Sequence, residues 1–328
     1  MSCPGVEENA EFWQKLPLTF KKEVVKSLDY KSSCCLQKCS KSDQYLVETT
    51  PLRMSYVTLK ADRTYNPITK KLEEQVAFSI FAENWKCINL HGVDNFLSVF
   101  KNRRTVAQSF WFDYFDENKP CVQKFVDDLK REMQKRGSSC KIRARKLQWN
   151  NNSEHRNVEP GVHFLRLLGC FDSKYLKSLD IVKSNFTSAT INMLAKSEYW
   201  WFLKEIKMGI NQPTMIDLFL TAERLKLSAQ SFKESELRKI VESYRSRDLP
   251  RGSYFQLDAQ KPWNLEEVLA GFPNVLSLEN VGSKRFYTQK LQIGTGERVL
   301  IVKLSADTIE GVVCRSNFLE EDFAKHSL

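Results

Sequence analysis

Residues 12–51 of this chain read FWQKLPLTFKKEVVKSLDYKSSCCLQKCSKSDQYLVETTP and carry many apolar side chains for so short a segment. Pro17 can open a helix, because the N–H that proline lacks would be unpaired in the first turn. Apolar side chains then recur every three or four residues, which predicts a helix of about two turns. They are Phe20, Val24, Val25 and Leu28. A unit of about forty residues is seldom stable alone, so we expect other parts of the chain or another protein to cover it.

Two further apolar sets follow this first helix. They are Cys34, Cys35, Leu36 and Cys39, and then, after the polar residues 40–43, Tyr45, Leu46 and Val47.

The order and spacing of these residues resemble an F-box, the three-helix segment with which substrate receptors dock on the adaptor of cullin-RING ubiquitin ligases. The matching positions are Leu16-Pro17, Val24-Val25, Leu28 with Asp29 after it, Leu36 and Cys39-Ser40. The sequence FWQKLP, followed by YKSSCCLQKCSKSD, is similar to the sequences of nematode F-box proteins with a C-terminal FTH domain. The resemblance implies that the adaptor contacts are Leu16, Pro17, Val24, Leu28 and Leu36.

One position departs from the F-box pattern. Many F-boxes place a Trp shortly after the Val/Cys-Ser pair, whereas this chain has Ser42, Asp43 and Gln44 there. The resemblance therefore implies a low affinity for the adaptor.

The composition is typical of a folded soluble protein. The chain has 328 residues, of which 42% are hydrophobic and 27% charged, enough for two or three domains. No run of eighteen apolar residues occurs, so we expect no transmembrane helix and no membrane partner. Residues 1–13 are acidic without an apolar stretch, and we expect no secretory signal. The nine cysteines, an odd number, predict reduced thiols and a cytoplasmic or nuclear location.

The net charge of +10 is concentrated in one segment. Between Lys130 and Lys146, one acid, Glu132, faces eight basic residues: Lys130, Arg131, Lys135, Arg136, Lys141, Arg143, Arg145 and Lys146. The first interpretation is a solvated helix end followed by an exposed strand edge. The second is a surface for an acidic partner or nucleic acid, with contacts from Lys141, Arg143 and Arg145.

Residues 52–138 predict a connecting region of mixed structure. Strand patterns cover 53–65, 76–81 and 87–90, whereas 93–100 and 110–115 are aromatic-rich and fit neither class clearly. A helix is expected from Pro120 to Gly137, with one apolar stripe. The stripe is Val122, Phe125, Val126, Leu129 and Met133.

From residue 139 to 275 short strands alternate with amphipathic helices. The expected strands are 141–149, 175–182, 202–210, 222–229 and 253–259, and the expected helices are 162–168, 187–196, 214–220, 235–244 and 265–270. Units of this kind stack into a curved parallel sheet, as leucine-rich repeats do. The spacing is irregular and the Asn of the repeat consensus is missing, so we predict a degenerate repeat.

The same half carries a second resemblance. Residues 140–275, with LLGCFDSKYLKSLDI, KSEYW, FLKEIKMGI and AERLKLSA, resemble the FTH domain. After them, 286–293, 299–304 and 309–314 alternate like antiparallel strands around a turn at Gly294-Thr295-Gly296. We expect a small sheet that closes the repeat stack. The predicted α/β chain thus contains an F-box (10–51), a connecting region (52–138), an FTH-like domain (139–275) and a C-terminal β segment (276–328).

The groups that an enzyme needs are not found in the sequence. The four histidines are far apart and lack metal-ligand spacing, and the Gly294 turn lacks the Lys of a phosphate loop. We expect no catalytic residue, metal or cofactor. Trp111, Trp149, Trp200 and Trp201 could stack bases if exposed, although residues 199–202 fit a buried core better.

Two functions fit these patterns. The first is a substrate receptor that docks on the ligase adaptor and binds a target protein. Alternation places Asp180, Lys207 and Lys226 on the polar side of their strands, where we expect target contacts, with the loops as the competing location. The second is an RNA-associated or other acidic-partner module that uses residues 130–146.

Overall fold

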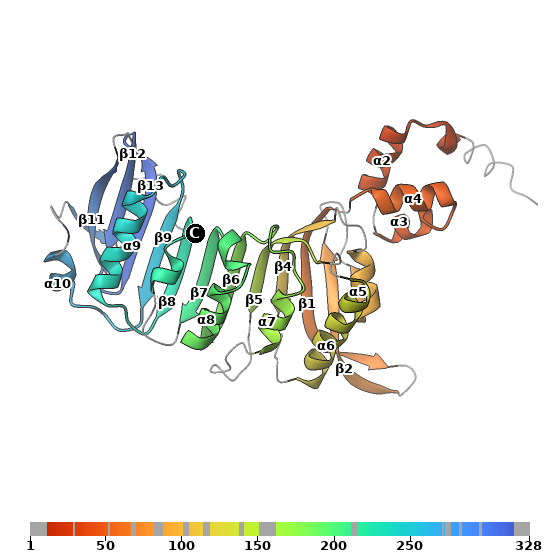
Figure 1. Cartoon of the computed structure of the whole chain (residues 1–328), viewed down its shortest axis with the longest axis horizontal. Helices are drawn as coiled ribbons and strands as arrows, with labels where there is room; N and C mark the ends of the chain where they lie inside the picture. Colours follow the sequence, from red (N-terminus) through yellow and green to blue (C-terminus); the bar gives the residue numbers. More distant parts are fainter. Residues whose placement is uncertain are drawn as a thin grey trace, which may run out of the picture. The chain divides into compact units, whose positions relative to one another are not determined.

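A computed structural model describes the chain in fourteen stretches. They are residues 12–28, 30–51, 53–66, 70–81, 88–100, 105–113, 119–137, 141–150, 162–210, 216–270, 272, 277–281, 284–294 and 297–317. The contacts divide the chain into two compact units. The first comprises Met1–Lys146 and Arg166–Asp172, and the second comprises Leu147–Leu165 and Ser173–Leu328. Each unit contains helices and strands, so the predicted mixed α/β class is confirmed (Figure 1).

Three helices form at the start of the first unit: α2 (Leu18–Ser27), α3 (Tyr30–Leu36) and α4 (Lys41–Thr49). Pro17 is the N-cap of α2, and Ser40 caps α4 by accepting a 3.0 Å hydrogen bond from the Asp43 backbone N–H. The indole of Trp13 donates a 2.8 Å hydrogen bond to the Asp43 carboxylate. That bond ties the segment before α2 to the first turn of α4.

The strands of the first unit are β1 (Arg53–Asn66), β2 (Lys71–Phe81), β3 (Ile88–His91) and β4 (Val106–Asp113). Their order is β3-β2-β1-β4, with only the β1–β4 pair parallel among these neighbours. Of the aromatic segments that the sequence left open, 93–100 contains α5 (Val93–Val99) and 110–113 form the second half of β4, while 114–115 lie outside the described residues.

Helix α6 (Pro120–Lys135) begins at the predicted proline and buries the whole predicted stripe. Helices α5 and α6 cover one face of this sheet (Figure 1). Phe96 of α5 is the centre of the core, with its ring 5.2–5.9 Å from those of Phe78, Phe110 and Phe125. Strand β5 (Ala144–Asn150) and helix α7 (Val162–Leu168) each contain residues of both units.

In the second unit, four successive strands are parallel neighbours. They are β6 (Ser178–Phe186), β7 (Glu205–Ile210), β8 (Arg224–Ala229) and β9 (Tyr254–Ala259). Helices α8 (Ser188–Ala195) and α9 (Glu234–Ser246) lie on one face of them (Figure 1). Tyr244 of α9 packs its ring 4.9 Å from that of Phe255, and its hydroxyl donates at 3.1 Å to the carbonyls of Ala222 and Tyr254. The buried hydroxyl joins the helix to β9 and to the turn before β8.

Two predicted elements of this unit are corrected. The helix expected at 214–220 is a 3-10 turn, η2 (Ile216–Phe219), within the described part of that range. The strand expected at 202–210 begins at Glu205, because Trp200–Phe202 form the 3-10 turn η1. The two turns pack together through Trp200, whose indole N–H donates at 2.9 Å to the Leu218 carbonyl. The turn η2 therefore takes the place of the expected helix, and η1 takes the place of the expected first residues of the strand.

The last strands are antiparallel, as predicted, but they extend the same sheet instead of forming a separate one. They are β10 (Ser277–Val281), β11 (Lys284–Ile293), β12 (Arg298–Leu304) and β13 (Thr308–Arg315). Strand β13 pairs with β9, and the order continues through β12 and β11 to β10. Helix α10 (Leu265–Ala270) lies between β9 and β10 in the chain. The edge of β9 is therefore covered by β13.

Candidate binding surfaces

The five expected adaptor contacts all lie in the described N-terminal helices or at their ends. Pro17 is exposed, and the other four side chains are half-buried: Leu16, Val24, Leu28 and Leu36. Helix α2 buries only Val25 among its residues. The five expected adaptor contacts are therefore partly covered by the chain and partly open to solvent.

Four large apolar side chains in or before the same helices are exposed: Phe12, Leu18, Phe20 and Tyr45. Leu18 is 56% and Phe20 54% exposed. Phe20 was predicted to share one helical face with Val24, Val25 and Leu28, and of these four described residues only Val25 is buried. Leu18 was missed since it falls outside the three- and four-residue spacing. An apolar residue directly after Leu16-Pro17 was the available signal.

The cysteines of the second apolar set are also more open than their pattern predicts. Cys35 and Cys39 are exposed free thiols, and Cys34 is half-buried. Helix α3 ends at Leu36, so Cys39 lies in the turn before α4 and not on a helical face.

Strand pairing brings three expected target contacts into one row. Asp180 pairs with Lys207, and Lys207 pairs with Lys226, on neighbouring strands. The preceding residue of each strand, Leu179, Ile206 or Leu225, is buried. Because successive side chains of a strand point to opposite faces, the charged row lies on the face opposite the apolar one, as the register predicted.

The row is less open to solvent than the sequence suggested. Asp180 is buried and accepts a 3.4 Å hydrogen bond from the Gln148 amide. The Lys207 side chain is only 23% exposed and pairs with Glu205 at 3.3 Å. Burial lowers the pKa of Lys207, but Tyr254, Glu205 and Asp180 outweigh that effect and raise it. This lysine therefore interacts with acidic groups of its own sheet.

The neighbouring row on the same face adds more polar groups. It runs through Ser178, Glu205, Arg224 and Tyr254 on β6 to β9. The Arg224 guanidinium lies 5.9 Å from the centre of the Tyr254 ring. Burial raises the pKa of Tyr254, and the adjacent Lys207 opposes that rise. Acidic and basic groups alternate, so this face has no large excess of either charge.

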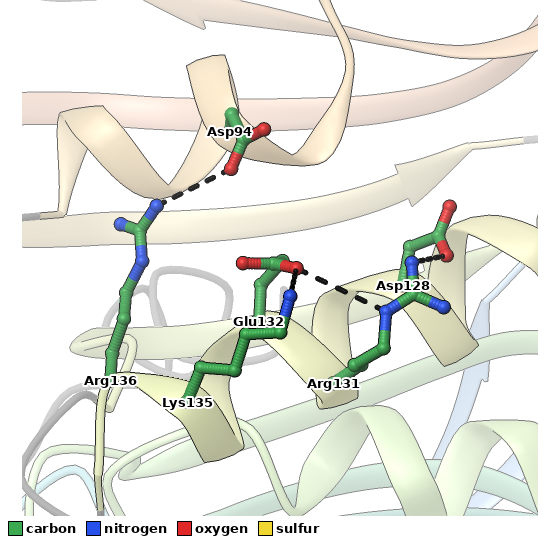
Figure 2. Close-up of polar contacts among 6 residues, drawn as sticks. All are labelled: Asp94, Asp128, Arg131, Glu132, Lys135 and Arg136. Carbon is green, nitrogen blue, oxygen red and sulfur yellow. Dashed lines mark hydrogen bonds and ion pairs between the residues drawn. The ribbon is translucent and has the colours of Figure 1, made fainter.

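In the basic segment, acidic residues of the fold compensate the charge. Figure 2 shows the helix α6 part, where Arg131 pairs with Asp128 at 2.5 Å and Lys135 with Glu132 at 2.7 Å. The hydrogen bond from Lys135 lowers the pKa of Glu132. Arg136 reaches Asp94 of α5 at 3.5 Å.

The strand part of this segment is also engaged. Lys141 donates to the Gly169 carbonyl, and Arg143 lies 3.5 Å from Asp172. Arg145 is exposed on β5. The count of charges over residues 130–146 did not include Asp94 and Asp172, because both lie outside that range in the chain. The segment is therefore a network of paired charges more than an unopposed basic surface.

Within the described stretches, no group of three His, Cys, Asp or Glu side chains is placed to hold a metal ion. No helix in those stretches is long and apolar enough to cross a membrane. Comparison with known proteins gave no relative: no family model, no curated protein and no solved structure matches this chain.

Proposed function

We propose that this chain is a non-enzymatic substrate receptor of a cullin-RING ubiquitin ligase. Its N-terminal helices, which resemble an F-box, would dock on the ligase adaptor, and its C-terminal half would bind the target protein. Catalysis would then be proximity, because a tethered target is held at high effective concentration near the ubiquitin-charged enzyme. The cytoplasm or nucleus is the compartment that this proposal requires.

The exposed apolar side chains of residues 12–45 carry this proposal. Leu18 and Phe20 lie on one short helix with more than half of each side chain in water. Burying a side chain of this size is worth about 1.5–3 kcal/mol, so a partner that covers either of them gains free energy. Exposed large apolar groups clustered on one small segment are typical of a docking surface.

The second unit supplies the other half of the proposal. We interpret its parallel strands β6 to β9 as a degenerate, leucine-rich-repeat-like stack that resembles the FTH domain. Such stacks present a continuous face to a partner. The basic segment 130–146 supports the acidic-partner alternative less than its sequence count did, since four of its basic side chains form ion pairs within the chain: Arg131–Asp128, Lys135–Glu132, Arg136–Asp94 and Arg143–Asp172.

Co-purification with the purified adaptor tests the docking assignment. Leu16→Ala with Pro17→Ala, and separately Leu18→Ala with Phe20→Ala, should each abolish capture of the full chain. Met193→Ala is the matched control, because Met193 is an exposed apolar residue of helix α8. We expect it to leave capture unchanged.

A second control separates docking from folding. Val25→Ala removes a buried side chain of α2 and should destabilise these helices by about 1–3 kcal/mol. The Leu18/Phe20 variant should instead keep the wild-type melting temperature. Full adaptor capture by that variant would exclude the docking surface assigned to α2.

A further inference from the structure

Three aromatic side chains are exposed at one edge of the parallel strands of the second unit. Trp201 is 75% exposed, and Tyr175 and Phe202 are also exposed. Tyr175 precedes β6, and Trp201 and Phe202 precede β7. The two strands are parallel, with Ser178 opposite Glu205, so their amino ends lie at the same edge of the sheet.

Backbone hydrogen bonds hold the two loops side by side. The N–H groups of Lys204 and Glu205 both donate to the Lys177 carbonyl, at 2.8 and 3.0 Å. The Lys177 ammonium lies 5.1 Å from the centre of the Phe202 ring. Lys177 and Phe202 are therefore in contact, and Tyr175 and Trp201 are their exposed neighbours in the chain; we name these four residues the aromatic edge.

Trp201 is exposed on a firmly anchored turn. Its neighbours Tyr199, Trp200 and Leu203 are buried. The Trp200 ring packs edge-to-face on Phe219 at 5.4 Å, and its N–H is hydrogen-bonded to Leu218. The expectation that residues 199–202 are all core is therefore wrong for Trp201 and Phe202. A fixed backbone presents the indole to solvent, which lowers the entropy lost when a partner binds it.

The charges around the aromatic edge are mostly basic. Lys174 and Lys196 are exposed and Lys177 is half-buried, whereas the acids are the exposed Glu198 and the half-buried Glu205, which pairs with Lys207 at 3.3 Å. Lys204 and Glu223 pair with each other at 2.8 Å. An acidic partner would meet a favourable potential here, which promotes association and selects against basic partners.

We propose that the aromatic edge binds an acidic polypeptide segment that carries a large apolar side chain. The apolar side chain packs on Trp201 and Phe202, and flanking carboxylates face Lys177 and its neighbours. Trp and Tyr are the residues in which binding energy most often concentrates. This inference rests on the proposed receptor function, since the segment would belong to the target.

Selection of random peptides tests this inference on the full chain. Phage-displayed peptides of about twelve residues are panned on the wild type and on Trp201→Ala. We expect the wild type to enrich net-acidic peptides with a Leu, Phe or Trp. Synthetic copies should bind Trp201→Ala and Lys177→Glu about tenfold or more weakly, and Met193→Ala with wild-type affinity.

Each of the following results would overturn the inference. Peptides that bind Trp201→Ala as well as the wild type use a different surface, and enrichment of basic peptides contradicts the charge argument. A single-stranded RNA that binds the wild type but not Trp201→Ala would assign the edge to nucleic acid. Self-association lost in the same variant would assign it to a second copy. Adaptor capture by Trp201→Ala is measured in parallel and should be unchanged, so failure of peptide binding is distinguishable from failure of docking.

Discussion

Gly311 shows how one residue permits the join between the parallel and antiparallel strands. It lies on β13 directly opposite Phe255 of β9. A Cβ at position 311 would overlap the Phe255 ring. Gly311→Ala should therefore cost about 1–3 kcal/mol of unfolding free energy, as overpacking does, measured by urea denaturation. In a Phe255→Leu background the cost should shrink, and an equal cost in both backgrounds would contradict this close contact.

The environment of Glu310 predicts that the free energy of unfolding depends on pH. Burial raises its pKa, although Lys303 and Lys226 oppose the rise. A raised folded-state pKa means that the fold favours the protonated carboxyl over the carboxylate. The contribution of the protonated form to the free energy of unfolding is present at low pH and is lost as the pH rises through that pKa. Glu310→Gln should therefore stabilise the protein more at pH 7 than at about pH 4.

Urea denaturation at both pH values measures this difference. Glu242→Gln is the control, because Glu242 is an exposed glutamate of helix α9. An equal effect of Glu310→Gln at the two pH values would show that the environment of Glu310 is wrongly described.

Among the elements, Lys207 of β7 can be compared with Lys204, which directly precedes that strand. Each pairs with a glutamate, but the side chain of Lys204 is 60% exposed and that of Lys207 only 23%. Lys207→Glu would place a third carboxylate beside Asp180 and Glu205. We expect it to lower the melting temperature clearly, whereas Lys204→Glu should cost about 0.5 kcal/mol or less. Equal, small shifts in calorimetry would mean that the Asp180 row is a freely solvated face.

The sequence predicted those elements whose apolar pattern was strong and local. The α6 stripe, the strand alternation of β7 and β8, and the row through Asp180 all follow from periodicity. The turn at Trp200 was not predictable in this way, because its shape depends on Leu218 and Phe219, which lie later in the chain. Periodicity also cannot tell which side of a short helix the rest of the chain covers, and for that reason it did not show that Phe20 is exposed.

Across the whole molecule, the net charge of +10 does not identify a partner by itself. Acids from distant elements, such as Asp94 and Asp172, pair with the basic segment. We predict that the full chain binds single-stranded RNA weakly at physiological salt. Lys130→Glu with Arg145→Glu should change the salt dependence of that binding little. A steep loss of affinity with salt that this double variant removes would favour the nucleic-acid function instead.

The central claim is that the N-terminal helices dock on a ligase adaptor through their exposed apolar side chains. Isothermal titration of the purified adaptor into the full chain at several temperatures tests it most directly. We predict saturable one-to-one binding with a negative heat-capacity change, since apolar surface is buried, and loss of that binding in the Leu18→Ala/Phe20→Ala variant. The absence of binding by the wild-type chain, or equal binding by the folded variant, would contradict the claim.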